Sequence, residues 1–324
     1  MTSTGLIDVH AHFVTDAYVA AARSAGIEHP DGMPGWPTWA VDEHLDLMRR
    51  SGIEKSYLSI SSPGVHFGDD GAARSLAREV NTFGARVRAE NPQRFGHFAS
   101  LPLPDVEGSL AETAYALDTL GADGVAVETN HHGVYLGDPR LEPLWEDLGR
   151  RGAVVFVHPT SPPHADELAL GRPRPMLEFL FDTARTASDL LLRGVLARHP
   201  RIRWVLTHGG GALPLLADRM ELFRTLLGGD LGDAPGSVEQ LGRLWYDMAG
   251  TPFPRQIPAL DAAFGTERLL YGSDYCWTPA DLALAQVESV DSAVQPSATD
   301  TWRALTNRNA RRLFTADTES LPGS

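Results

Sequence analysis

The sequence has almost no cysteine and almost no lysine. Cys276 is the one cysteine among 324 residues, so an internal disulfide is excluded and a reducing cytoplasm is the expected location. Lys55 is the one lysine among 28 basic residues. A mechanism that needs an active-site lysine would therefore have to use Lys55.

Positive charge and long apolar runs are also scarce. The 42 acidic residues outnumber the 28 basic ones, and the net charge of -14 argues against nucleic acid and anionic membranes as partners. No uncharged apolar run approaches the roughly 18 residues of a membrane-spanning helix. The chain reaches its first apolar segment within a few residues, so no signal peptide is expected. A small anionic substrate stays compatible with this charge, because a bound cation reverses the local field.

Short apolar runs alternate with amphipathic stretches along most of the chain. The runs with the residue types of buried strands are Leu6–Val9, Lys55–Ile60, Phe95–Leu101, Gly124–Glu128, Val154–Val157, Arg203–Thr207, Leu244–Met248 and Leu269–Gly272. The helical stretches are Val41–Ser51, Ala72–Asn91, Ser109–Leu120, Arg140–Arg151, Thr183–Arg198, Leu213–Leu227, Arg255–Phe264 and Ala298–Phe314. This alternation predicts an α/β fold, a (β/α)8 TIM barrel formed as one domain by residues 1–324.

Three stretches interrupt the repeat. Ala25–Thr38 is rich in Gly and Pro, Pro159–Pro175 is rich in Pro and His, and Gly228–Gly236 is a Gly/Asp loop. The first two follow the first and fifth predicted strands. In a barrel they would be loop insertions over the C-terminal face, where catalytic sites lie.

Two histidines follow the first apolar run in the segment Ile7-Asp8-Val9-His10-Ala11-His12. Side chains two residues apart on a strand point to the same side, so His10 and His12 would emerge together, as metal ligands do. The alternative is a pair of loop histidines that bind nothing. Asp8 is expected to face away from both of them in a structural role.

Other predicted strands also end in polar residues of metal-ligating type. His158 ends the fifth strand, His208 the sixth and Asp274 the eighth, whereas Asp247 on the seventh is expected to be a buried hydrogen-bond partner. Any one of them alone could be a structural residue. Together with the histidine pair they predict a metal site, because imidazole and carboxylate suit zinc and also manganese or iron.

The order of these residues resembles the amidohydrolase superfamily. The segments Phe156–Pro159, Thr207–Gly211 and Gly272–Tyr275 resemble its branch of non-oxidative decarboxylases, typified by aminocarboxymuconate semialdehyde decarboxylase. Within that branch the closest resemblance is to 6-methylsalicylate decarboxylases. It is carried by Gly35–Trp39, Ser59–Gly64, Arg151–Pro159 and Phe181–Leu192.

The resemblance implies a role for each candidate residue. His10, His12, His158 and Asp274 would bind one divalent metal ion, zinc first and manganese as the alternative. His208 would be the catalytic acid or base, and the proton donor to the substrate ring would be His208 or Asp274. Binuclear members carry a carbamylated lysine at the end of strand 4. Here that strand ends without a lysine, so a mononuclear site is expected.

The substrate residues depart from the type member. Its loop after strand 1 carries an arginine for a substrate carboxylate, and the comparable segment here, Pro34–Trp39, has none. This departure favours an aromatic monocarboxylic acid over a muconate, unless Arg172 or Arg174 replaces the missing arginine. The candidate substrate-binding residues are Trp36, Trp39, Asn130, His131 and Trp277. Loop packing is an equal alternative for Trp36 and Trp39, and a solvated loop is the alternative for Asn130 and His131.

The resulting hypothesis is an enzyme, a metal-dependent carboxy-lyase that decarboxylates an ortho-hydroxy aromatic acid of the 6-methylsalicylate type. The rival is a metal-dependent hydrolase that opens a lactone or amide, because the same ligands can activate water. A metal-binding scaffold without catalysis is the third hypothesis. We expect a homodimer with a small aromatic carboxylic acid as substrate.

Overall fold

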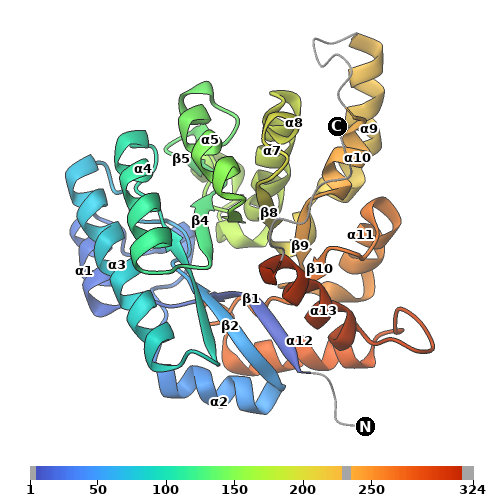
Figure 1. Cartoon of the computed structure of the whole chain (residues 1–324), viewed down its shortest axis with the longest axis horizontal. Coiled ribbons are helices and arrows are strands. Elements are labelled where there is room, and N and C mark those ends of the chain that lie inside the picture. Colours follow the sequence, from blue (N-terminus) through green and yellow to red (C-terminus); the bar gives the residue numbers. More distant parts are fainter. Residues whose placement is uncertain (1–4, 228–234, 316–324) are drawn as a thin grey trace.

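A closed parallel barrel forms the centre of the molecule (Figure 1). The computed structural model describes residues 5–227 and 235–315. Its barrel strands, in spatial order, are β1 (Leu6–His12), β2 (Ile53–Ser59), β3 (Phe95–Ser100), β4 (Gly124–Glu128), β7 (Val154–His158), β8 (Arg203–Leu206), β9 (Trp245–Asp247) and β10 (Leu269–Leu270). The ring closes where the Val9 N–H donates to the Tyr271 carbonyl at 2.9 Å. The predicted (β/α)8 barrel is therefore confirmed.

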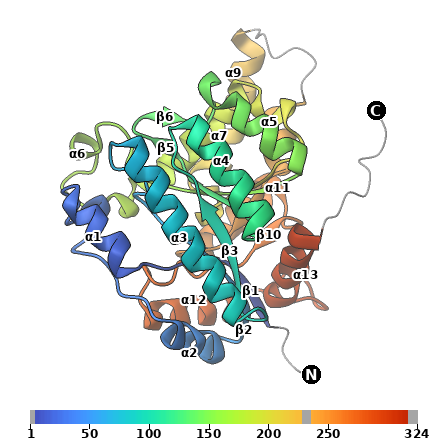
Figure 2. The ribbon, with the colours of Figure 1, turned by 60° about the vertical axis from the view of Figure 1, so that its left-hand side comes forward.

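Helices surround the barrel, and Figure 2 shows α3 packed along β3. They are α1 (Asp16–Ser24), α2 (Val41–Ser51), α3 (Asp70–Glu90), α4 (Val106–Ala114), α5 (Glu142–Arg151), α6 (Ala165–Leu168), α7 (Glu178–Leu192), α8 (Val195–Arg198), α9 (Leu213–Leu227), α10 (Ser237–Gly242), α11 (Ile257–Phe264), α12 (Ala280–Ser292) and α13 (Trp302–Thr315). No described helix is long and apolar enough to cross a membrane.

The observed elements correct the sequence prediction in three places. The helix expected over Thr183–Arg198 is two helices, because Gly194 adopts a left-handed φ of 71° between α7 and α8. Helices α1, α6, α10 and α12 were not predicted. Helix α1 buries only Tyr18 and Ala22, which is too few residues for a clear apolar stripe. A short hairpin, β5 (Asn130–His131) with β6 (Val134–Tyr135), was also missed. Of the expected Gly/Asp loop, residues 228–234 lie outside the described ranges.

Strand β1 runs through both histidines instead of ending at Val9. Ala11 and His12 still pair with β2, but the register shifts between Asp8 and Ala11. Such a bulge reverses which face the following side chains take. Ile7 and Val9 point into the barrel interior, and after the bulge the His10 ring also lies inside, 5.1 Å from the Phe156 ring.

Asp8 holds this bulge together. Its buried carboxylate accepts the N–H of His10 at 3.1 Å and the N–H of Ser273 at 3.0 Å. It lies between the inward-facing Ile7 and Val9 and therefore faces the other way, as expected for a structural residue.

The barrel interior below the histidines is filled with side chains. Phe98 and Phe156 stack there with ring centroids 5.3 Å apart, and Val205 and Leu270 pack beside them. At the opposite end Phe314 of α13 stacks on Tyr57 at 3.9 Å. The barrel is thus a packed core, and the polar site lies at the C-terminal ends of its strands.

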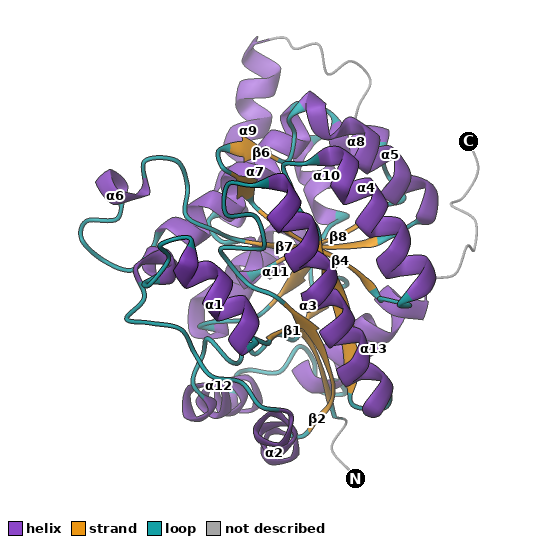
Figure 3. Cartoon of the chain, turned by 90° about the vertical axis from the view of Figure 1, so that its left-hand side faces the viewer, coloured by secondary structure: helices purple, strands orange, loops and turns teal. Residues whose placement is uncertain are grey.

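The two long loops meet over that C-terminal face. The loop after β7 contains α6 and stands away from the barrel (Figure 3). It contacts the loop after β1, because Asp31 accepts the N–H of Ser161 at 3.1 Å and its hydroxyl at 2.6 Å. These are the loop insertions that the sequence predicted.

Candidate metal centre and active site

The four predicted metal ligands converge at one point. His10 and His12 come from β1, His158 ends β7, and Asp274 follows β10. Their ligand atoms lie within 4.8 Å of one another, and within the described ranges this is the one group of three or more such side chains with metal-binding geometry. The two Nε2 atoms of His10 and His12 are 3.0 Å apart. Asp274 Oδ1 lies 3.4 Å from the first and 3.3 Å from the second.

The hydrogen bonds around the imidazoles fit a divalent cation. His10 Nδ1 donates to the buried carboxylate of Asp247 at 2.8 Å, and His158 Nδ1 donates to the Pro159 carbonyl at 2.7 Å. With Nδ1 as the donor, each ring in its neutral form presents an unprotonated Nε2 to the centre, the tautomer that a metal ligand needs. On His10 a bound metal ion would replace the proton that Asp247 and Asp274 otherwise hold on the ring. A cation held by the facing nitrogens and the Asp274 carboxylate would relieve their mutual repulsion. Three imidazoles with one carboxylate are a donor set of the zinc type.

The electrostatics of the site also draw in positive charge. Burial opposes protonation of His10, but Asp247 and then Asp274 outweigh it and raise the pKa of His10 to about 10. Burial lowers the pKa of His158 well below its usual range, and His12 and His10 add to this. Burial also opposes charge on Asp274, yet hydrogen bonds from His10, His12 and His208 hold the pKa of this carboxyl well below its usual value.

His208 lies beside the metal group but outside it. Its Nε2 is 3.7 Å from Asp274 Oδ2, while its backbone N–H donates to Asp247 Oδ1 at 2.9 Å. Its Nδ1 is buried and has no hydrogen-bond partner in the described structure. The chain turns sharply after it, and a Cβ at Gly211 would lie 2.1 Å from the Leu180 carbonyl oxygen, so the close approach requires glycine.

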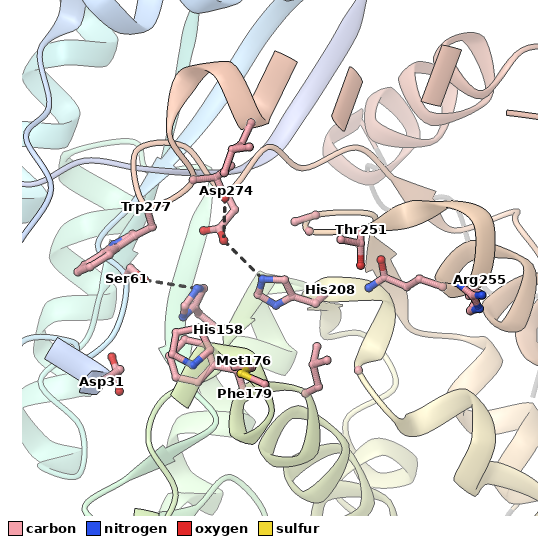
Figure 4. A pocket seen from close by; sticks show the side chains of 18 of the residues that line it. Asp31, Ser61, His158, Met176, Phe179, His208, Thr251, Arg255, Asp274 and Trp277 are labelled. Carbon is pink, nitrogen blue, oxygen red and sulfur yellow. Dashed lines mark hydrogen bonds and ion pairs between the residues drawn. The ribbon is translucent and has the colours of Figure 1, made fainter. Parts of the chain in front are cut away.

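A cavity of about 1010 Å³ opens above these residues (Figure 4). His158, His208 and Asp274 line its base, and Trp277 forms part of one wall. Sequence reasoning missed several other lining residues, which come from loops and from the start of helix α7. Among them are Asp31, Ser61, Met176, Phe179, Thr251 and Arg255. Ser61 could have been named from the sequence, because it lies in the Ser59–Gly64 segment that carries the family resemblance. Its hydroxyl is 3.3 Å from His158 Nε2.

The three predicted tryptophans are placed differently. Trp277 lines the cavity, and Trp36 lies behind it with ring centroids 5.8 Å apart. Trp36 donates its indole N–H to the Ile27 carbonyl, and Trp39 donates to His44 Nδ1 at 3.0 Å and packs on Phe13. Neither Trp36 nor Trp39 is in the cavity lining, so both make the loop-packing contacts named as the alternative.

The residues expected after strand 4 lie elsewhere. Asn130 donates to Asp182 at 3.0 Å and to the Ser161 carbonyl at 3.2 Å. With the buried His131 it lines a separate cavity of about 510 Å³. The structure therefore does not bring Asn130 or His131 to the metal group. Arg174 pairs with Asp166 and does not line the main cavity.

Strand β4 ends in the carboxyl group of Glu128. This is the strand end at which the binuclear members of the superfamily carry their lysine. Glu128 is buried 3.6 Å from His158 Nδ1, and burial raises its pKa well above the usual value. Asp247, expected to be a buried hydrogen-bond partner, is fully buried and bonds to His10 and His208.

Comparison with known proteins agrees with this geometry. The family model described as "Amidohydrolase" matches residues 7–315. The 6-methylsalicylic acid decarboxylase of Penicillium expansum is 36% identical over 316 residues, covering 95% of each chain. Decarboxylase yanB of Aspergillus niger is 36% identical over 330 residues, 95% of this chain and 87% of the relative. The crystal structure of an amidohydrolase II is 32% identical with a TM-score of 0.88, covering 96% of this chain and all of that one. The chain therefore belongs to the amidohydrolase family, in the decarboxylase branch that its motifs predicted.

Proposed function

We propose that the protein is a metal-dependent non-oxidative decarboxylase of an ortho-hydroxy aromatic acid of the 6-methylsalicylate type. The observation that carries this proposal is the His10, His12, His158 and Asp274 cluster at the base of a cavity, with His208 beside it. The relatives named as decarboxylases support the reaction class.

The four ligands would hold one divalent ion, zinc first and manganese as the alternative. The bound ion would supply a Lewis acid for the substrate carboxylate and its neighbouring phenol oxygen. The aromatic and apolar side chains of Phe179, Met176 and Trp277 line the cavity and would hold the ring by burial and stacking. Trp36 would hold Trp277 in place through their ring contact. Trp39, Asn130 and His131 do not line the cavity and would make no substrate contact.

The proton step falls to His208 and Asp274. Direct loss of CO2 would leave an aryl anion orthogonal to the π system, so the ring carbon that bears the carboxylate is protonated first. The C–C bond then breaks, its electron pair restores aromaticity, and CO2 leaves. Asp274 Oδ1 faces the histidine ligands and Oδ2 faces His208, so the His208–Asp274 pair can hold the proton at the cavity base. Each member of the pair remains a candidate donor.

Product analysis tests the proposal against its rival. The metal-loaded protein is incubated with 6-methylsalicylate, and CO2 and 3-methylphenol are measured together. We expect them in equal amounts. The same ligand group could activate water to open a lactone or an amide. Lactone opening without CO2 release from any salicylate would overturn the proposed reaction.

We further propose that the protein is a cytoplasmic homodimer. The single cysteine supports the location, and measurement of mass in solution by light scattering tests the dimer. A monomer at micromolar concentration would contradict it.

A further inference from the structure

Two serines at and just after the end of β2 contact predicted metal ligands through different ring nitrogens. Ser59, the last residue of β2, has its hydroxyl 3.0 Å from His12 Nδ1. His12 turns its other nitrogen, Nε2, toward the ligand group, so Ser59 lies behind this ring. Ser61 lies in the loop after β2, and its hydroxyl is 3.3 Å from His158 Nε2, the contact drawn in Figure 4. This is the nitrogen with which His158 would bind the ion, so Ser61 lies on the metal side of its ring.

The Ser61 hydroxyl is buried and belongs to the main cavity. The residue is 6% exposed and lines this cavity, whereas Ser59 does not. Within residues 5–227 and 235–315, the contact with His158 is the one hydrogen bond that its side chain makes. Because Nε2 of the neutral His158 ring is an acceptor, the Ser61 O–H is the donor. The same lone pair would bind an ion, so in the metal-loaded protein the buried hydroxyl needs another acceptor.

Two other polar groups that line the cavity already have partners. The hydroxyl of Ser62 is 2.6 Å from the hydroxyl of Thr160. The carboxylate of Asp274 is shared among two histidine ligands and His208. In the loaded site, the acceptor that remains for Ser61 is therefore an oxygen of the molecule bound beside the ion.

We propose that Ser61 donates its hydroxyl hydrogen to the substrate carboxylate that is held at the metal group. The inference rests on the proposed function and deepens it by naming a substrate-binding residue. The carboxylate is the strongest acceptor on an ortho-hydroxy aryl acid, because hydrogen bonds to ionised groups are shorter and stronger than neutral ones. A neutral donor also suits a monocarboxylic acid, whose single charge the ion balances, and the segment Pro34–Trp39 supplies no arginine for it.

The first test is the steady-state kinetics of Ser61→Ala on 6-methylsalicylate. The carboxylate loses its negative charge as CO2 leaves, so a hydrogen bond to it stabilises the bound substrate at least as much as the transition state. We expect KM to rise about ten-fold and kcat to stay within about two-fold of wild type. Ser61→Thr keeps a hydroxyl and should recover most of the lost affinity. An unchanged KM in Ser61→Ala would overturn the contact.

Zinc affinity, measured by competition with a chelator, separates a substrate contact from a merely supporting role. Ser61→Ala should bind zinc at least as tightly as wild type, because the hydrogen bond to His158 is absent from the loaded site. Ser59→Ala should bind zinc about ten-fold more weakly, because it removes the hydroxyl at His12 Nδ1. A comparable loss of zinc affinity in Ser61→Ala would make Ser61 a support for His158 and overturn the proposal.

Ser51→Ala is the matched control for the loss of a buried hydroxyl. Ser51 is buried, donates to the Leu47 carbonyl at 2.6 Å and does not line the cavity. This variant should lose stability in urea and keep KM and zinc affinity at their wild-type values. An equal rise of KM in Ser51→Ala and Ser61→Ala would show that the effect is not local to the cavity, and would overturn the contact.

Calorimetric titration with two analogues of the substrate identifies the acceptor. 2-Methylbenzoate keeps the carboxylate and lacks the phenol oxygen, whereas 3-methylphenol keeps the phenol oxygen and lacks the carboxylate. In zinc-loaded Ser61→Ala, binding of 2-methylbenzoate should weaken about ten-fold and binding of 3-methylphenol should not change. Weaker binding of the phenol alone, or of both analogues equally, would overturn the carboxylate as the acceptor.

These titrations need no turnover, so the contact and the reaction can fail separately. Binding of 2-methylbenzoate that weakens about ten-fold in Ser61→Ala, with no CO2 released from any acid, would support the contact and refute the reaction. CO2 release from 6-methylsalicylate, with 2-methylbenzoate binding unaffected by Ser61→Ala, would refute the contact and leave the reaction standing.

Discussion

Asp247→Asn is the substitution that most directly tests how the metal ligands are oriented. The Asp247 carboxylate is fully buried and accepts three hydrogen bonds. Oδ2 accepts His10 Nδ1 at 2.8 Å, and Oδ1 accepts the backbone N–H groups of His208 and Ala249, both at 2.9 Å. One carboxylate therefore fixes the tautomer of a metal ligand and anchors the backbone of the proposed acid–base residue.

The asparagine side chain can replace only part of these hydrogen bonds: either those to the two backbone N–H groups or the one to His10. If its oxygen keeps the two backbone N–H groups, its NH2 faces His10 Nδ1, and the imidazole must move its proton to Nε2, the atom that faces the other ligands. If the amide flips, two buried N–H groups lose their acceptor at about 1–3 kcal/mol each. Loss of such a partner typically weakens metal binding about 10–100-fold. We expect this loss in affinity, and a metal-free protein less stable by about 1–3 kcal/mol.

The assay is competition for zinc with a chelator of known affinity, followed by kcat at saturating metal and by urea unfolding of the metal-free protein. Asp182→Asn is the matched control. Asp182 is also buried and accepts hydrogen bonds from Thr129, Asn130 and Tyr135, but it does not contact the four ligands. The control should lose stability and keep its metal affinity. A zinc affinity of Asp247→Asn within about three-fold of wild type would refute the orienting role.

Three further outcomes are expected. Elemental analysis should find one divalent ion per chain, and thorough chelation should abolish turnover; two tightly bound ions, or full activity after chelation, would contradict the mononuclear site. His208→Asn should keep the metal, because His208 lies outside the ligand group, yet lower kcat about 10²–10⁴-fold; metal loss in this variant would place His208 among the ligands. Burial lowers the pKa of His44 and His97 to about 3, from 6.5 in the unfolded chain. The unfolded state then binds more protons, so stability is full above pH 6.5 and falls as the pH drops toward 3, by about 1.4 kcal/mol per pH unit for each histidine. Burial raises the pKa of Asp8 to about 7, so this carboxyl opposes the histidines over the same range. Urea unfolding of the metal-free wild type and of His97→Gln at pH 7 and pH 5 isolates one histidine, and an equal pH dependence in the two proteins would contradict its contribution.

Much of the barrel could be predicted because its strands carry a local signal. Each strand is a short apolar run that ends in a polar residue or a turn, and all eight appear within one to three residues of their predicted ends. The signal is weaker for helices that bury few side chains. Helix α12 has Ala283, Gln286, Val287 and Val290 buried, but its Leu282 is 61% exposed, so no single apolar face stands out from the sequence.

The metal ligands were predictable for the same reason, since residues at strand ends must meet at one face of a barrel. The bulge in β1 was not. On a regular strand Asp8, His10 and His12 would share one face, so the expectation that Asp8 faces away from the histidines is met only through the bulge. Nothing in the local sequence indicates that Asp8 accepts the N–H groups of His10 and Ser273. The residues of the substrate cavity were the least predictable, because the path of a loop depends on distant partners. Trp36 donates its indole N–H to the Ile27 carbonyl and Trp39 donates to His44, so neither lines the cavity. Arg255 lines the cavity, although no sequence pattern pointed to it.

The metal ligands and the substrate-cavity residues lie on different kinds of backbone. The metal ligands sit on or beside strands whose backbone is held by the barrel ladder, and Asp247 on β9 ties His10 to His208 through hydrogen bonds of 2.8 and 2.9 Å. Trp277 and Arg255 sit on connections that carry no such ladder. Loop changes can therefore alter which ring is bound while the ligand geometry is preserved. Metal affinity and substrate preference should accordingly respond to different substitutions.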